Sequence, residues 1–198
     1  MTAQLKLPVA PMTLDEFFAW DGGGHVGKLE LVDGVVRAMA PASATHSIIQ
    51  GNILFAIKTH LRGNRCRAGT EAPIIPPMAR RINARAPDIA VTCAPISDSP
   101  VFEDPVLIVE VLSPSNQADT WESIHALAGL VSLKEILIVQ STTIGAEVYT
   151  RAADGAWPRD PVVVGGDGTI VLASIECEVP MAEVYAGTHL ANLDGGQS

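Results

Sequence analysis

The sequence predicts an α/β (α+β) fold in which a mixed β-sheet is flanked by helices and preceded by an N-terminal helix and a β-hairpin. Two apolar runs, at 87–91 and 106–112, are rich in β-branched residues and too short for helices, so they predict buried strands. Between 49 and 61 an apolar residue recurs every four positions, which is typical of an amphipathic helix that packs on a sheet.

The first elements are marked by a helix cap and a tight turn. Residues 13–16 have the sequence Thr-Leu-Asp-Glu, a capping-box pattern that predicts a short helix ending near Trp20, where three glycines follow. Residues 29–39 hold the dipeptide Asp33-Gly34 between two apolar stretches, which is a strong signal for a hairpin with a two-residue turn.

The remaining elements follow from periodicity and turn residues. A long helix is predicted from about Ala44 to Leu61, and a second capping-box pattern at 119–122 predicts a helix that runs to about Gly129. Besides the two buried runs, further strands are expected at 66–70, 74–75, 135–140 and 147–151 and near Val162 and Ile170.

The length of 198 residues suits one domain with a sizeable core. We expect an N-terminal extension over 1–12, a single domain over 13–187 and a flexible tail over 188–198. No stretch approaches the roughly eighteen apolar residues of a membrane span, and the N-terminus lacks the features of a targeting leader. These features predict a cytoplasmic protein, and the positive mean hydropathy of so acidic a chain predicts a homodimer.

The chain carries a formal net charge of −9. Such a surface repels phosphate on average, which argues against a general nucleic-acid-binding protein. Most of the basic residues fall between Lys58 and Arg85, however, and a local basic patch could guide a nucleic acid; the alternative is a solvated helix end and loop. The residues expected to bind nucleic acid are Arg62, Arg65, Arg67, Arg80, Arg81 and Arg85.

The cysteines do not form a recognisable pattern. Cys66, Cys93 and Cys177 are odd in number, widely spaced and without a CxxC motif or neighbouring histidines. Neither a disulfide framework nor a zinc site is indicated, so we expect three buried, reduced thiols.

Two carboxylates in the apolar runs are the main candidates for chemistry. An ionised Glu110 within a run of Val, Leu and Ile would lose hydration worth several kcal/mol unless it were paired, hydrogen-bonded or bound to a metal. If the two strands are neighbours, Asp88 and Glu110 could share one hard divalent cation, which favours metal-assisted hydrolysis. The alternatives are an arginine partner or a protonated carboxyl for Glu110, and loop capping or an ion pair with Arg85 for Asp88.

Five short segments, each weak alone, occur in an order that resembles a nuclease family. They are Glu30-Leu31-Val32-Asp33-Gly34, His46 at the start of the long helix, Pro87-Asp88, Glu110-Val111-Leu112-Ser113-Pro114-Ser115 and Val179-Pro180-Met181-Ala182-Glu183-Val184-Tyr185. From about Thr13 to about Tyr185 the chain thus resembles the Uma-type (Uma-two) family, a branch of the PD-(D/E)XK, or restriction-endonuclease-like, fold. The resemblance implies a DNA endonuclease in which Asp88 and Glu110 bind Mg²⁺ or Mn²⁺ and Glu30 supports the catalytic site.

Two of these residues have ordinary structural alternatives. Glu30 lies opposite Arg37 if the hairpin has a two-residue turn, and a cross-strand ion pair would then explain both residues. A lone histidine such as His46 more often caps a helix or satisfies a core group than it acts as an acid or base.

The main departure from the family pattern is the missing lysine. A PD-(D/E)XK nuclease needs a cation to stabilise charge in the transition state. The usual spacing puts it at Leu112, and the resemblance puts the shifted family position at Ile124, so both positions are apolar. This predicts weak or absent catalysis and keeps two alternatives open: a non-catalytic binding or regulatory module, and a hydrolase of small phosphorylated or nucleotide substrates.

Overall fold

The computed structural model describes residues 7–8, 10–24, 27–95, 97–114 and 116–192. A six-stranded sheet has the order β3-β4-β5-β6-β7-β8, and two separate two-stranded sheets are formed by β1 with β2 and by β9 with β10. The helices are α1 (Leu14–Ala19), α2 (Ala44–His60), α3 (Gln117–Leu127) and α4 (Met181–Val184). The strands are β1 (Leu29–Val32), β2 (Val35–Ala38), β3 (Arg67–Thr70), β4 (Ile89–Thr92), β5 (Pro105–Leu112), β6 (Glu135–Gln140), β7 (Ala146–Thr150), β8 (Val162–Val164), β9 (Thr169–Leu172) and β10 (Cys177–Pro180).

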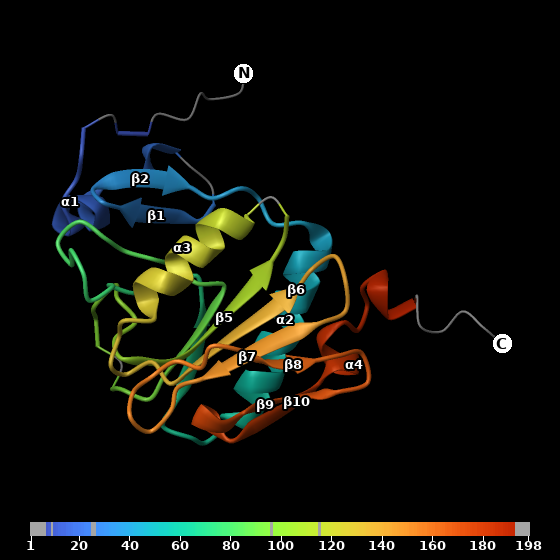
Figure 1. Cartoon of the computed structure of the whole chain (residues 1–198). Coiled ribbons are helices and arrows are strands. Elements are labelled where there is room, and N and C mark those ends of the chain that lie inside the picture. The colour runs from blue at the N-terminus through green and yellow to red at the C-terminus, as the bar shows by residue number, and fades with distance from the viewer. Residues whose placement is uncertain (1–6, 9, 25–26, 96, 115, 193–198) are drawn as a thin grey trace.

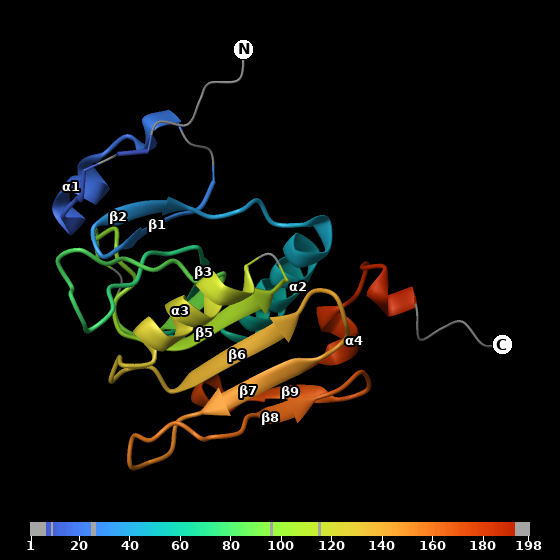
Figure 2. The same ribbon diagram turned by 45° about the horizontal axis from the view of Figure 1, so that its top comes forward.

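The main sheet is mixed, as the sequence predicts. Strands β5 and β6 are parallel, and the other neighbouring pairs are antiparallel. Figure 1 shows α3 in front of this sheet and α2 behind it, and Figure 2 shows β5 to β8 side by side with the β1–β2 hairpin as a separate layer. The expected α/β sheet flanked by helices is therefore confirmed.

Strand β5 divides the core between the two faces of the sheet. Leu107, Val109 and Val111 pack in the cluster that contains the apolar side of α2. Ile108 and Leu112 pack instead against α3, because successive side chains of a strand point to opposite faces. Glu110 lies between those two residues in the alternation and thus belongs to the α3 face.

The N-terminal elements form as their local sequence predicts. Thr13 and Glu16 make both hydrogen bonds of a capping box at the start of α1. The hairpin turns at Asp33 and Gly34, whose φ angles of 50° and 81° are those of a two-residue turn with both central residues left-handed. Helix α2 also agrees closely with the predicted range.

The start of α3 differs from the prediction. The helix begins at Gln117, so the pattern at 119–122 lies within the helix and does not cap it. Asn116 holds the N-cap position, but its side chain accepts the amide of Ser113 at 2.8 Å and tightens the preceding turn. A side chain that folds back on the turn cannot be distinguished in sequence from one that caps forward.

The expectation of three free thiols is wrong for two cysteines. Cys66 and Cys93 form a disulfide, while Cys177 is free and buried as expected. Arg67 pairs with Thr92 at the end of the antiparallel β3–β4 ladder. One step beyond this pair, Cys66 lies opposite Cys93. Cysteine spacing alone does not reveal such a register, and this is why the pair was missed.

The C-terminal part packs further than expected. Leu190 is buried and joins the core cluster on the α2 face, so ordered packing extends beyond residue 187. The rest of the expected tail, from 193, and most of the N-terminal extension lie outside the described residues. No helix in the described part of the chain is long and apolar enough to cross a membrane.

Candidate active site

Asp88 and Glu110 are neighbours across two paired strands. Ile89 pairs with Val109 in the antiparallel β4–β5 ladder, so the next step of the register places Asp88 opposite Glu110. Both residues are buried, with exposed fractions of 5% and 3%. The expectation that these two strands lie side by side is confirmed.

Three donors surround the carboxylate of Asp88. Oδ1 accepts from Nζ of Lys28 at 3.2 Å, and Oδ2 accepts from Nε2 of His46 at 3.2 Å and from the amide of Val111 at 2.8 Å. Burial alone would raise the pKa of Asp88, but the His46 hydrogen bond, the Lys28 charge and the Val111 amide together lower it to about 2. Asp88 is therefore a rigidly held anion.

His46 enters the site because Ser43 caps α2 and fixes the first turn beside β4. One turn further, Gln50 donates its side-chain amide to the carbonyl oxygen of Asp88 at 2.8 Å. His46 is buried and bonds the carboxylate of Asp88, which agrees with the alternative that it satisfies a buried polar group.

Lys28 is the residue that the sequence reasoning missed. Its carbonyl accepts the amide of Met39, so it extends the hairpin ladder by one residue, and its side chain is only 14% exposed. Burial alone would lower the pKa of Lys28, but the carboxylates of Glu110, Asp88 and Glu30 outweigh that effect and raise it. One signal in the sequence could have indicated it. Lys28 lies two residues before Glu30, and alternate residues of a strand share a face, so Lys28 is expected on the same side of the hairpin as Glu30.

Glu110 is buried, and its pKa depends on the charges around it. Burial raises its pKa well above the ordinary value, the charge of Lys28 opposes this, and the charges of Asp88 and Glu30 add to it. The positive charge that favours the ionised form of Glu110 is that of Lys28. The protonated-carboxyl alternative agrees with the direction of this shift.

Glu30 is held on both oxygens. Oε1 accepts from the amide of Ala86 at 2.9 Å and the hydroxyl of Ser123 at 3.4 Å, and Oε2 accepts from Nη1 of Arg85 at 3.4 Å. The predicted register opposite Arg37 is confirmed. The predicted ion pair is wrong, however, because Arg37 extends across the hairpin face to α3.

There, Nη1 of Arg37 lies 2.8 Å from Oε2 of Glu122, and Nη2 of Arg85 lies 3.0 Å from Oε1 of the same carboxylate. These bonds lower the pKa of Glu122, the hydrogen bond from Arg37 contributing most. The hairpin, the segment before β4 and helix α3 are thereby joined around the site.

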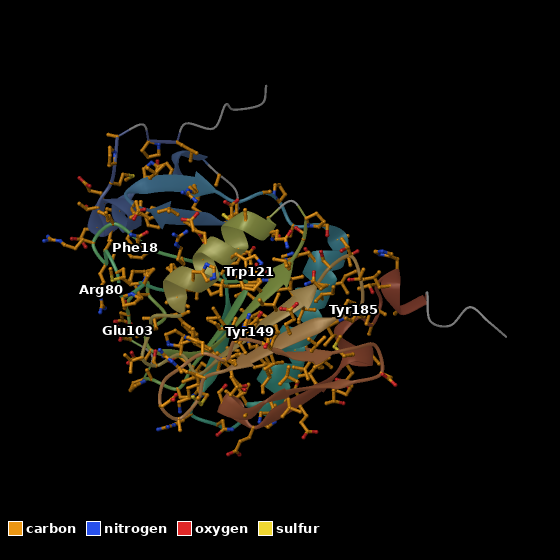
Figure 3. All side chains as sticks on the ribbon, in the orientation of Figure 1. Phe18, Arg80, Glu103, Trp121, Tyr149 and Tyr185 are labelled. Atoms are coloured by element: carbon orange, nitrogen blue, oxygen red, sulfur yellow. A yellow bond between two sulfur atoms is a disulfide. The ribbon has the colours of Figure 1, made fainter. Side chains whose placement is uncertain are left out.

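The six arginines expected to bind nucleic acid do not form one patch. Arg85 is buried and paired, so its expected place on an exposed basic surface is wrong. Arg80 and Arg81 are exposed near α1, where the Arg81 carbonyl accepts the amide of Leu14, and Figure 3 labels Arg80 beside Phe18 of that helix. The other three, Arg62, Arg65 and Arg67, are exposed at the C-terminal end of α2.

That second group is remote from Asp88. His46 lies near the start of α2, and Arg62 follows its C-cap Leu61. At 1.5 Å of rise per residue the helix alone separates the two ends by roughly 20 Å. These arginines could contact a nucleic acid only well away from the carboxylates.

A pocket of about 350 Å³ opens over Asp88 and Lys28. Its walls come from the hairpin, the start of α2 and the turn before α3. The lining residues are Gly27, Lys28, Met39, Ala40, Pro41, Ala42, Ser43, His46, Glu71, Asp88, Ser113 and Asn116. Glu110 lies beneath this surface.

The donors suit a hard divalent ion in chemistry but are not arranged as a complete ligand set. Asp88 and Glu110 offer carboxylate oxygens, the ligands that Mg²⁺ and Mn²⁺ prefer. Within the described residues, however, no group of three or more His, Cys, Asp or Glu side chains is placed to hold a metal. The Lys28 ammonium sits at Oδ1 of Asp88, so an ion there would need Lys28 to withdraw and water or main-chain oxygens to complete its ligands.

The two positions at which the pattern expects a lysine are core positions. Leu112 is 5% exposed and Ile124 is 4% exposed, and both pack in the cluster between β5 and α3. The interpretation of Ile124 as a packing residue is confirmed.

Comparison with known proteins gives a consistent match. The Uma2 family, described as "Putative restriction endonuclease", matches residues 14–182. The uncharacterised protein slr1290 of Synechocystis is 31% identical over 153 residues, covering 76% of this chain and 80% of that protein. The crystal structure of a putative nuclease belonging to DUF820 from Anabaena variabilis is similar in fold, with a TM-score of 0.67, 19% identity, and coverage of 89% of this chain and 98% of the other.

Proposed function

The chain belongs to the Uma2 family of restriction-endonuclease-like proteins, and from that premise we propose that it is a metal-dependent endonuclease that hydrolyses DNA phosphodiester bonds. The observation that carries the proposal is the pair of neighbouring, buried carboxylates Asp88 and Glu110, of which Asp88 lines a pocket together with Lys28. Burying an ionised carboxylate costs desolvation free energy, so two such groups side by side indicate a cationic partner or a functional role.

In this function Asp88 and Glu110 would hold Mg²⁺ or Mn²⁺, which supplies a Lewis acid and an activated water. His46 and the Val111 amide orient Asp88. Glu30 supports the site from the hairpin, since its bonds to Arg85 and Ala86 fix the segment that leads into Asp88.

The DNA contacts are proposed to be local. With a net charge of −9 the whole surface does not attract a phosphate backbone, so affinity must come from exposed basic groups and depend strongly on salt. Arg80 and Arg81 lie on the hairpin side of the molecule. Arg62, Arg65 and Arg67 are too far from Asp88 to contact the phosphate that reacts.

The proposal is tested by incubating supercoiled plasmid with the purified chain and Mg²⁺ or Mn²⁺. We expect nicking that disappears when the metal is chelated and falls at least about 10²-fold in Asp88→Asn and Glu110→Gln. Asp167→Asn is the matched control, because Asp167 is exposed in a turn between strands. Metal-independent nicking, or equal nicking by Asp88→Asn, would show that the activity does not arise at this site.

A second function has two observations in its favour. Leu112 and Ile124 are apolar, and the described residues offer no complete metal ligand set, as expected of a binding or regulatory module that retains the nuclease fold. Saturable DNA binding by the wild type, with no cleavage at any divalent-ion concentration, would select this alternative.

Self-association is proposed on separate grounds. Val162 and Val163 of the edge strand β8 and Val171 of β9 are all more than half exposed. Edge strands with exposed apolar side chains readily pair with a second copy. Light scattering should give twice the chain mass of 20.8 kDa, and a monomer mass would contradict this part of the proposal.

A further inference from the structure

We propose that Lys28 is the catalytic cation of this site and takes the place of the lysine that the nuclease pattern puts at 112 or 124. The inference rests on the function proposed above and assigns it a residue outside the motifs that suggest that function. Lys28 precedes the first strand of the hairpin, whereas the expected positions belong to β5 and α3.

The position of the ammonium is the first argument. Nζ of Lys28 lies 3.2 Å from Oδ1 of Asp88, and the charge interacts with Glu110 and Glu30 as well. An ammonium at that distance from Asp88 can neutralise negative charge that develops on a phosphate beside this carboxylate.

The access to the pocket is the second argument. Lys28 and Asp88 line the same pocket of about 350 Å³, so a phosphate in that space would meet both residues. Among the pocket-lining residues that the structure describes, Lys28 is the only lysine or arginine. Arg85, another buried cation, is bound by Glu30 and Glu122 and is not among the lining residues of this pocket.

The anchoring of the residue is the third argument. The Lys28 carbonyl accepts the amide of Met39 at 3.0 Å, which ties its main chain to the hairpin. The side chain is only 14% exposed and its ammonium is bonded to Asp88, so both ends of the residue are held in place. A preorganised donor of this kind stabilises charge that develops in a transition state without the cost of reorganising solvent.

The reaction step is hydrolysis. A water oxygen forms a bond to phosphorus, the bond from phosphorus to one ester oxygen breaks, and that oxygen leaves with the electron pair. The water gives up one proton to solvent and the leaving oxygen takes one, so the net reaction consumes one water and yields a phosphomonoester and an alcohol. Lys28 remains protonated and donates to a non-bridging oxygen as its negative charge grows.

The competing explanation is that Lys28 is only a counterion for the buried carboxylates. Lys28→Met removes the charge and keeps the length of the side chain, Lys28→Arg keeps the charge, and Lys134→Met is the control because Lys134 is exposed on the segment before β6. Each variant is tested as the full chain for plasmid nicking, for Mn²⁺ affinity by calorimetry, and for binding of a short DNA duplex in Ca²⁺. Circular dichroism confirms folding.

A catalytic role predicts that Lys28→Met nicks about 10²- to 10³-fold more slowly while it binds Mn²⁺ at least as tightly as the wild type, because a positive charge that competes at Asp88 is gone. Lys28→Arg should recover part of the rate, and duplex binding in Ca²⁺ should weaken in Lys28→Met alone. A counterion role predicts instead that Lys28→Met is less stable without metal but nicks at the wild-type rate once it is saturated with Mn²⁺, which would overturn the inference.

The failures can be told apart. If the wild type nicks and Lys28→Met nicks equally, the inference is wrong and the nuclease function stands. If the wild type neither nicks nor binds Mn²⁺, the proposed function fails and the inference with it. If Lys28→Met does not fold, the neutral variant Lys28→Gln takes its place: a lower kcat with little change in KM supports the catalytic role, and an unchanged kcat excludes it.

Discussion

Nη1 of Arg85 lies 3.4 Å from Oε2 of Glu30, and both side chains are almost fully buried. The pair joins the first strand of the hairpin to the segment that leads into Asp88. A buried ion pair adds little net stability when it is intact. Removing one partner is costly, because the other charge is left without compensation.

We therefore predict that Glu30→Ala lowers the free energy of unfolding by roughly 3–5 kcal/mol. Urea denaturation measures the change. The comparison is Glu122→Ala, whose carboxylate bonds the same arginine but is 44% exposed and should contribute at most about 1 kcal/mol. Equal losses in the two variants would mean that burial does not distinguish the two carboxylates.

A second prediction concerns pH. Hydrogen bonds from Arg37 and then Arg85 lower the pKa of Glu122 in the folded state. A carboxyl with a lowered folded pKa stabilises the fold above its unfolded value of about 4.5 and loses that contribution as the pH falls through the folded pKa. Wild type should thus exceed Glu122→Gln in stability at neutral pH by less than about 1 kcal/mol, because the group is solvated.

The measurement is the stability difference between these two proteins in urea from pH 7 to pH 3. The difference should be constant down to about pH 5 and shrink below pH 4.5. A difference that grows on acidification would show that the arginines do not hold the ionised form of Glu122.

Local sequence signals predicted the fold well and the site only in part. The capping box, the Asp33-Gly34 turn and the apolar strands are each encoded within a few residues, so the hairpin register and the neighbouring positions of Asp88 and Glu110 could be derived. The partners of these carboxylates could not. Lys28 is 60 residues from Asp88, and only the packing of the hairpin against the sheet brings the two together.

The cysteines illustrate the same limit. The disulfide between Cys66 and Cys93 depends on the register of β3 against β4 across a separation of 27 residues. The positions 112 and 124 illustrate it again. Both are apolar core positions, whereas a buried ammonium, that of Lys28, reaches Asp88 from another element, and such a meeting is a matter of position in space and not of position in the sequence.

The third prediction concerns the disulfide. A cross-link over this separation removes loop entropy from the unfolded chain, and we expect Cys66→Ser/Cys93→Ser to lose roughly 3 kcal/mol of stability. Thiol titration of the denatured, unreduced wild type should find one free thiol, that of Cys177. Three titratable thiols in protein kept under air would contradict the disulfide.

The fourth prediction concerns the position at which the family pattern expects the lysine. Ile124→Lys places an ammonium in the apolar cluster between β5 and α3, which should cost several kcal/mol. If Lys28 already supplies the cation, the new lysine brings no gain in nicking. The control is Val131→Lys, at a residue that is 92% exposed, where stability should change by at most about 0.5 kcal/mol. Faster nicking by Ile124→Lys would show that the site lacks a cation and that Lys28 does not provide one.

The last prediction concerns metal binding by the folded protein. Asp88 and Glu110 repel each other across the β4–β5 ladder, and a divalent ion between them would relieve that repulsion more fully than the single charge of Lys28. A ligand that binds only the folded state stabilises it by about 2.7 kcal/mol at a free concentration of 100 Kd. For a chain of this size that corresponds to a rise in Tm of roughly 5–10 °C. Calorimetric melts with and without Mn²⁺ should show this shift in the wild type and in Asp167→Asn, and no shift in Asp88→Asn/Glu110→Gln.

The double variant should also differ from the wild type without metal. It removes two anions around Lys28, so its Tm in the absence of Mn²⁺ should fall even though its carboxylate repulsion is gone. An equal Mn²⁺ shift in the double variant would place the ion elsewhere on this acidic surface and remove Asp88 and Glu110 from the list of ligands.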